Sequence, residues 1–112
     1  MPKIYKELGS SSPTSATYTN LYSVPAGTQT VISSIAICNA TASARTFRLA
    51  QTASATAASA TALADHFVYD TTVPVNDTTF ITAGISLNDR QNLVVYSSAG
   101  SVIFTAWGVE IS

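Results

Sequence analysis

The feature that most constrains the fold is a period of two in the apolar residues, repeated in several short segments. It is clearest between Thr28 and Cys38, where Val31, Ile35 and Ile37 share one face of an extended chain. Successive side chains of a strand point to opposite faces, so this pattern is typical of a strand with one buried side. Val, Ile and Thr far outnumber Leu and Met, and branched side chains favour strands over helices. The sequence therefore predicts an all-β protein.

Clusters of Asn, Asp, Gly and Pro separate the alternating segments and mark turns between them. We expect about seven or eight strands, and no strand–helix–strand alternation indicates a parallel sheet. The spacing predicts one antiparallel β-sandwich, wound as a jelly roll or in an immunoglobulin-like order. The expected strands cover residues 21–24, 28–38, 45–51, 65–73, 78–87, 93–98 and 102–111.

Two segments fall outside this pattern. Residues 1–16 contain Gly9, a run of serines and Pro13, which interrupt regular structure, so they predict an extended N-terminal arm before a sandwich over residues 17–112. Such an arm either frays or docks on a neighbouring subunit. Residues 52–64 are rich in Ala, Ser and Thr but lack an apolar stripe, which predicts a surface loop with at most one helical turn.

Charged residues are scarce. Five Lys and Arg stand against six Asp and Glu, and charged residues make up 10% of the 112, well below the roughly 25% of an ordinary soluble domain. No basic cluster suits nucleic acid or an anionic membrane, and no apolar run suits a signal peptide or a membrane helix. We therefore expect a chain that is made in a cytoplasm and stays soluble or assembles there. A free monomer normally carries more charge, so the composition predicts a surface that is covered in the working state.

The last expected strand, residues 102–111, is apolar on both of its faces. A strand with one solvated face should alternate, so two apolar faces predict burial on both sides. Another copy of the chain is the simplest second cover, and the alternative is a central strand covered by the chain's own loops. The predicted subunit-interface residues are Ile4, Tyr5, Leu8, Tyr18, Tyr22, Val102, Phe104 and Trp107.

No combination of residues predicts catalysis. The single His66 and the single Cys38 could formally pair, but a cysteine at the end of an apolar strand is usually structural. A zinc site needs three or four ligands, and the few carboxylates are scattered. Arg45 and Arg48 flank Phe47, yet two arginines without a wider basic field favour ion pairs over nucleic-acid binding. We predict no catalytic residue, no cofactor and no metal.

Several stretches resemble small structural proteins of tailed bacteriophages. They are residues 1–9, 21–28, 31–39, 46–49, 69–70, 76–78 and 104–112. The resemblance implies a virion protein that is assembled in the bacterial host cytoplasm and has no catalytic residues. It leaves the place on the particle open among capsid exterior, neck, baseplate and fibre.

Together with the low charge, this resemblance leads us to expect a decoration or cement protein on the capsid exterior. Its partners would be itself, as a homo-oligomer with a trimer favoured, and the major capsid protein or other virion proteins. The alternative is a tail-fibre, neck or baseplate module that attaches to the host surface. A small enzyme or inhibitor is a third class.

Overall fold

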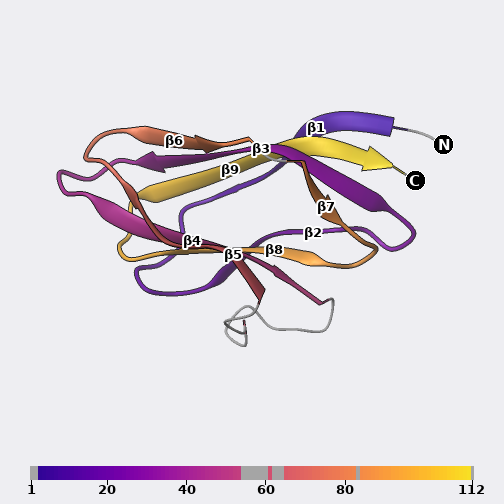
Figure 1. The fold of residues 1–112 in the computed structure, drawn as a ribbon, viewed down its shortest axis with the longest axis horizontal. Helices are drawn as coiled ribbons and strands as arrows, with labels where there is room; N and C mark the ends of the chain where they lie inside the picture. The colour runs from indigo at the N-terminus through magenta and orange to yellow at the C-terminus, as the bar shows by residue number, and fades with distance from the viewer. Residues whose placement is uncertain (1–2, 54–60, 62–64, 83, 112) are drawn as a thin grey trace.

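The computed structural model describes residues 3–53, 61, 65–82 and 84–111 (Figure 1). These residues form nine strands, which account for most of the described chain. The strands are β1 (Lys3–Ser11), β2 (Thr19–Ser23), β3 (Gln29–Asn39), β4 (Arg45–Thr52), β5 (His66–Val73), β6 (Thr78–Ile81), β7 (Ile85–Leu87), β8 (Asn92–Ser97) and β9 (Val102–Ile111). Most of the loop expected over residues 52–64 lies outside the described residues.

The strands pair into two antiparallel sheets that lie one above the other (Figure 1). The first sheet has the order β1-β9-β3-β6, with β7 also paired to β3, and the second has the order β2-β8-β4-β5. This arrangement confirms the prediction of an all-β antiparallel sandwich.

The core lies between the sheets and is built from the inward side of each strand. Phe47 of β4 and Phe104 of β9 are fully buried and meet edge to face, with ring centroids 6.2 Å apart. Leu49, Leu93 and Val95 are also fully buried, as the alternation in their strands predicts. Burial of each such side chain contributes roughly 1.5–3 kcal/mol to folding.

A bulge in β3 changes which residues face the core. The sequence pattern places the odd-numbered Val31, Ile35 and Ile37 on the inward face, but Ile32 is fully buried and Val31 is only half-buried. The pairing with β9 shifts between Ile32 and Ser34, so one extra residue enters the strand there. An extra residue reverses the inward–outward parity of everything before it.

The long strand expected over residues 78–87 is divided in two. β6 pairs with residues 35–38 of β3 and β7 pairs with residues 30–32, so the break lies opposite the bulge. A bulged strand bends and twists more strongly than a regular one. A single straight partner therefore does not follow β3 along its whole length.

The N-terminal segment is extended, as expected, but it belongs to the sandwich. Strand β1 pairs with β9 along its length and forms an edge of the first sheet. Leu8 packs against the core. Backbone groups on the second edge of β9 need hydrogen-bond partners, and β1 supplies them. The described sandwich thus begins at Lys3 and not at residue 17.

Candidate interaction surface

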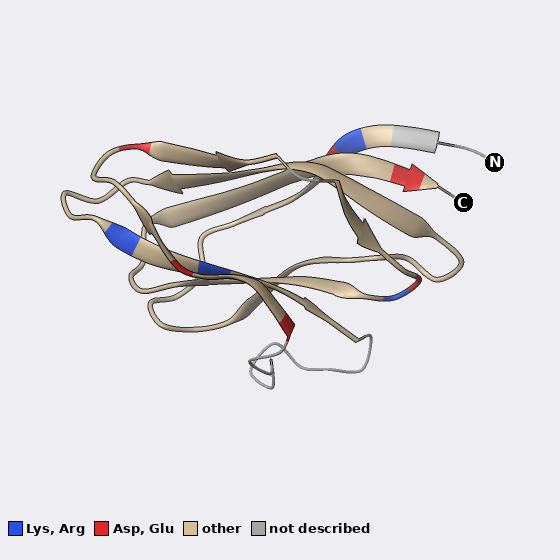
Figure 2. Cartoon of the chain, in the orientation of Figure 1, with Lys and Arg blue, Asp and Glu red and all other residues tan. Residues whose placement is uncertain are grey.

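The central strands of the two sheets differ in charge, and in the first sheet Lys6 and Glu7 lie on the edge strand β1 (Figure 2). Strands β3, β6 and β7 contain no charged residue, and the only one in β9 is Glu110. Strand β4 carries Arg45 and Arg48, and the adjacent β5 carries Asp70. Among the described residues, the centre of the first sheet is therefore free of charge, whereas the second sheet is not.

The outer side of the first sheet is rich in apolar side chains. Along β9, the buried residues Val102, Phe104 and Ala106 alternate with half-buried residues on the opposite side. Cross-strand partners in an antiparallel sheet point to the same side, so the register assigns the outward residues of the neighbouring strands. We call this surface the apolar face. Its apolar members are Tyr5, Val31, Ala36, Cys38, Phe80, Ile103, Trp107, Val109 and Ile111, and the same register places Ser34, Thr105 and the edge-strand Glu7 among them.

Two predicted interface residues meet on the apolar face. Tyr5 is 65% exposed, and its hydroxyl lies 2.5 Å from Ser33 Oγ on β3. Because β9 lies between β1 and β3, the Tyr5 side chain crosses the outer side of β9. Ser33 Oγ also donates a hydrogen bond to the Trp107 carbonyl oxygen at 3.2 Å. Tyr5 and Trp107, near opposite ends of the sequence, thus belong to one surface.

Other predicted interface residues lie inside the fold. Val102 and Phe104 are fully buried, and Tyr22 is 9% exposed. In the single chain these three side chains thus lie inside the fold and not on its surface, contrary to the sequence expectation. For Val102 and Phe104 the reason is that both faces of β9 are apolar and the sequence does not show which face turns inward. Leu8 packs on the core, and only the backbone position of Ile4, opposite Glu110, is described.

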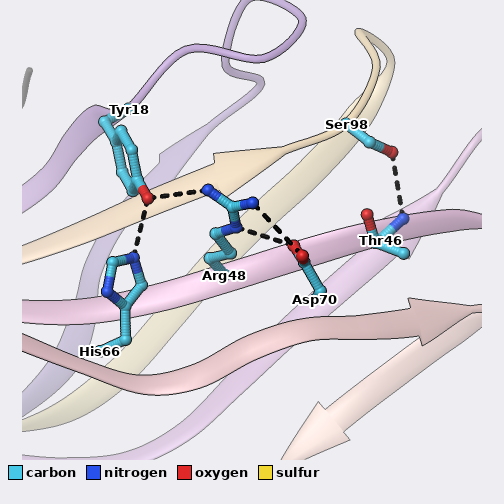
Figure 3. A network of polar contacts seen from close by, with 6 residues as sticks. All are labelled: Tyr18, Thr46, Arg48, His66, Asp70 and Ser98. Atoms are coloured by element: carbon cyan, nitrogen blue, oxygen red, sulfur yellow. Dashed lines mark hydrogen bonds and ion pairs between the residues drawn. The ribbon is translucent and has the colours of Figure 1, made fainter. Parts of the chain in front are cut away.

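Tyr18 belongs to a polar cluster on the second sheet (Figure 3). Arg48 donates hydrogen bonds to Asp70 through Nε at 2.7 Å and through Nη2 at 3.3 Å, and to the Tyr18 hydroxyl at 3.0 Å. The Tyr18 hydroxyl also lies 2.8 Å from His66 Nε2. The Arg48 hydrogen bonds hold the pKa of the Asp70 carboxyl below its ordinary value.

Aromatic rings enclose the Arg48 guanidinium group of this cluster. Its central carbon lies 4.2 Å from the centroid of the Tyr69 ring and 4.3 Å from that of the Tyr96 ring. Asp70 has a positive φ of 51°, in a bulged part of β5, which turns its carboxylate toward Arg48. Cation–π contacts and a bidentate carboxylate favour a fixed guanidinium, so the cluster ties the edge strand β5 to the sheet. Phe47 lies in the core and takes no part.

A second polar cluster connects the two sheets at the end of β9. The Tyr22 hydroxyl donates to Glu110 Oε2 and lies 2.8 Å from Thr30 Oγ1. Lys6 Nζ lies 2.9 Å from Glu110 Oε1. Burial, and then the hydrogen bond to Glu110, raise the pKa of Tyr22 to about 12. The Tyr22 and Lys6 hydrogen bonds lower the pKa of Glu110.

We expect alkaline pH to weaken the fold through Tyr22. Its folded-state pKa of about 12 exceeds its ordinary value of 10.0, so its contribution is complete below pH 10 and is lost between pH 10 and 12. The loss should amount to roughly 2 kcal/mol in the free energy of unfolding. Urea denaturation across this range measures it. Tyr22→Phe should flatten the dependence, whereas the exposed Tyr5→Phe should not; equal slopes in the two variants would contradict this assignment.

Acid should weaken the fold through Glu110. Its folded-state pKa is lowered, so its contribution is complete above the ordinary value of 4.5 and is lost as pH falls below that value. Glu110→Gln should reduce the change of the urea midpoint with pH below 4.5. Asp70→Asn, which removes a carboxylate with a different partner, should leave the contribution of Glu110 to that change in place. A wild-type midpoint that does not change below pH 4.5 would contradict the prediction.

The residues that sequence reasoning considered for chemistry do not converge. Cys38 lies on the apolar face of the first sheet, opposite Ile103, and His66 lies on the second sheet. No group of three or more His, Cys, Asp or Glu that could hold a metal occurs within the described ranges. The surface of the described residues has no detectable pocket. The same residues include no helix long and apolar enough to cross a membrane.

Comparison with known proteins gives no assignment. No family model matches the chain, and no curated protein matches it in sequence. The geometry and the composition are therefore the basis for a functional proposal.

Proposed function

We propose that this chain is a non-catalytic structural protein of a bacteriophage virion, present in many copies as a decoration or cement protein on the capsid exterior. The observation that carries the proposal is the apolar face, a sheet surface with several apolar side chains and no outward charge on its central strands β3 and β9. Contiguous exposed apolar surface on a soluble protein generally marks an interaction site. The resemblance to small phage structural proteins supplies the kind of particle.

A cement protein acts by contacting neighbouring subunits of a larger shell. Largely preformed surfaces suit this role because they bury area without a conformational cost. The sandwich offers such a surface on a frame held by long antiparallel strands. Its partners would be the major capsid protein or other virion proteins, and itself as a homo-oligomer of closed symmetry.

Binding to particles tests this function. Bare phage capsids that lack the protein are mixed with the purified chain and sedimented, and the bound chain is quantified against the major capsid protein. We expect saturation at a fixed ratio, together with an increase in the temperature at which the particles rupture. Absence of binding to capsids would contradict the capsid role.

A second candidate is a tail-fibre, neck or baseplate module that contacts the host surface. Phe67 and Tyr69 on the edge strand β5 are 38% and 49% exposed, and exposed aromatic rings beside polar groups suit carbohydrate stacking. In the same experiment this candidate predicts binding to host cells or their polysaccharide in place of capsids. Phe67→Ser and Tyr69→Ser would then reduce cell binding, whereas Phe80→Ser on the other sheet would not.

A further inference from the structure

We propose that the apolar face is covered by another copy of this chain, with Trp107 at the centre of the contact. The inference deepens the proposed assembly role, on which it rests, by naming the partner of this surface. The outward residues of β9 and β3 form the middle of the face, and the edge strands β1 and β6 contribute Tyr5 and Phe80.

The size of the face is sufficient for a stable contact. Strand β9 has ten residues, which at about 3.3 Å per residue span roughly 33 Å. Four strands about 4.8 Å apart give a width of roughly 19 Å, and hence a footprint on the order of 600 Å². A standard specific interface buries about 800 Å² on each partner, whereas incidental contacts bury about half of that or less. Side-chain relief adds to the flat footprint, so the face falls within the specific range.

The charge distribution favours an identical partner. When identical faces meet, charges near the centre approach their own copies and repel. The outward positions of β3, β6 and β9 carry none. Glu7, on the edge strand β1 and in register with Trp107, does lie on this side of the sheet, whereas Lys6 and Glu110 pair with each other on the opposite side. The two central strands thus present apolar side chains with Ser33, Ser34 and Thr105 and no charge, so they can face their own copies without repulsion, while Glu7 stays on an edge strand.

The edges of the sheets suit association less well than the face. The edge strands β1, β2 and β5 each contain at least one register shift, and the remaining edge of the first sheet is divided between the short strands β6 and β7. Bulges at an edge discourage the addition of another strand. Contact through the face requires no change in any strand.

The single tryptophan of the chain reports directly on this contact. Trp107 is half-buried in the isolated chain and would be fully buried between two copies. We expect sedimentation velocity to give a mass that is a multiple of 11.7 kDa. Dilution should lower this mass and shift the Trp107 fluorescence emission to longer wavelength, with both changes following one curve.

A matched pair of lysine variants identifies the surface. Val109→Lys places a charge on the apolar face, on the central strand β9, and Thr72→Lys places the same charge at an exposed position of β5. We expect single-chain mass and fully red-shifted emission for Val109→Lys, and wild-type association for Thr72→Lys. Phe80→Lys, at a position that is 64% exposed, provides a second face variant whose folding should be unaffected. Thermal melting by circular dichroism verifies that each variant is folded.

The outcomes separate this inference from the proposed function. A wild-type chain of single-chain mass at every concentration, or an oligomer that Val109→Lys and Phe80→Lys both leave intact, would overturn the inference. If that monomer still bound bare capsids, the proposed function would stand. An oligomer that dissociates in the face variants but binds no phage particle would support the inference and overturn the virion role.

Discussion

Replacing Gly108 with alanine should destabilise the protein by about 3 kcal/mol or more, a large part of the roughly 5–15 kcal/mol that stabilises a typical domain. Gly108 is buried in the middle of β9. A Cβ atom there would clash with the Val31 carbonyl oxygen and would lie 3.0 Å from Ile32 Cα. Both are backbone atoms of β3, so relief of the clash would separate the two central strands of the first sheet.

Urea denaturation measures this effect through the midpoint and its slope. Gly100→Ala is the matched control, because a Cβ there meets no atom within 4 Å and its φ is not in the left-handed region. We expect Gly100→Ala to change the free energy of unfolding by no more than about 0.5 kcal/mol. Similar midpoints for the two variants would show that β3 and β9 can separate at little cost.

The position of Gly108 also explains the shape of the apolar face. The β3 bulge lies between Ile32 and Ser34, directly opposite Gly108 and Trp107. The β1 bulge, between Glu7 and Gly9, lies opposite Trp107 and Ala106. Both neighbours of β9 therefore carry an extra residue at the same level, where bulges bend a sheet. Gly108, where β3 comes close, and Trp107 therefore lie at the level of these two bulges.

The sequence identifies strands well where the alternation is unbroken. Period two alone assigns Phe47, Leu49, Leu93 and Val95 to the inward side, and all four are fully buried. The two sheets follow from the same information, since short antiparallel strands with one apolar side must face another layer. The fold class is thus determined by local patterns that each segment carries independently.

The sequence does not identify features that depend on pairing between distant segments. Ser33 is an ordinary strand residue until it is set against β9, where it becomes the extra residue that brings Ile32 inward. Gly9 indicates a break in the sequence pattern, yet it lies within β1 where that strand passes close to Leu21. A Cβ added at Gly9 would lie only 2.6 Å from the Leu21 carbonyl oxygen. Phe104 and Trp107 are on opposite faces of a strand apolar on both sides, and only the packed sheets determine which of them is buried.

Asn39 provides the second large effect, because its side chain joins two loops from a fully buried position. Its Nδ2 group donates to the carbonyl oxygens of Ser43, Val73 and Pro74 at 2.9–3.1 Å. Its Oδ1 atom accepts from the Thr41 backbone N at 3.0 Å and from Thr41 Oγ1 at 2.7 Å. One amide thus satisfies groups on the loop after β3 and on the turn between β5 and β6.

Asn39→Ala should lower the free energy of unfolding by about 3 kcal/mol, since several buried polar groups lose their partner together. Asn39→Asp should cost at least as much, because a carboxylate keeps the acceptor but faces three carbonyl oxygens without a proton to donate. A stability loss for Asn39→Asp as large as that for Asn39→Ala would not result from lost packing, because aspartate has nearly the volume of asparagine. Urea midpoints of the two variants give the comparison.

Asn20→Ala is the matched control for Asn39. Asn20 is exposed and donates to Ser23 Oγ at 2.8 Å, so water can replace its partner and the loss should stay below about 0.5 kcal/mol. Amide hydrogen exchange locates the effect. The backbone amide of residue 39 donates to the Asp77 carbonyl oxygen, and that of Asn76 donates to the Thr41 carbonyl oxygen. In Asn39→Ala these two amides should lose more protection than the amides of β8. An Asn39→Asp variant as stable as the wild type would mean that the three carbonyl oxygens do not depend on this donor. The connection between the two loops would then rest on the backbone hydrogen bonds alone.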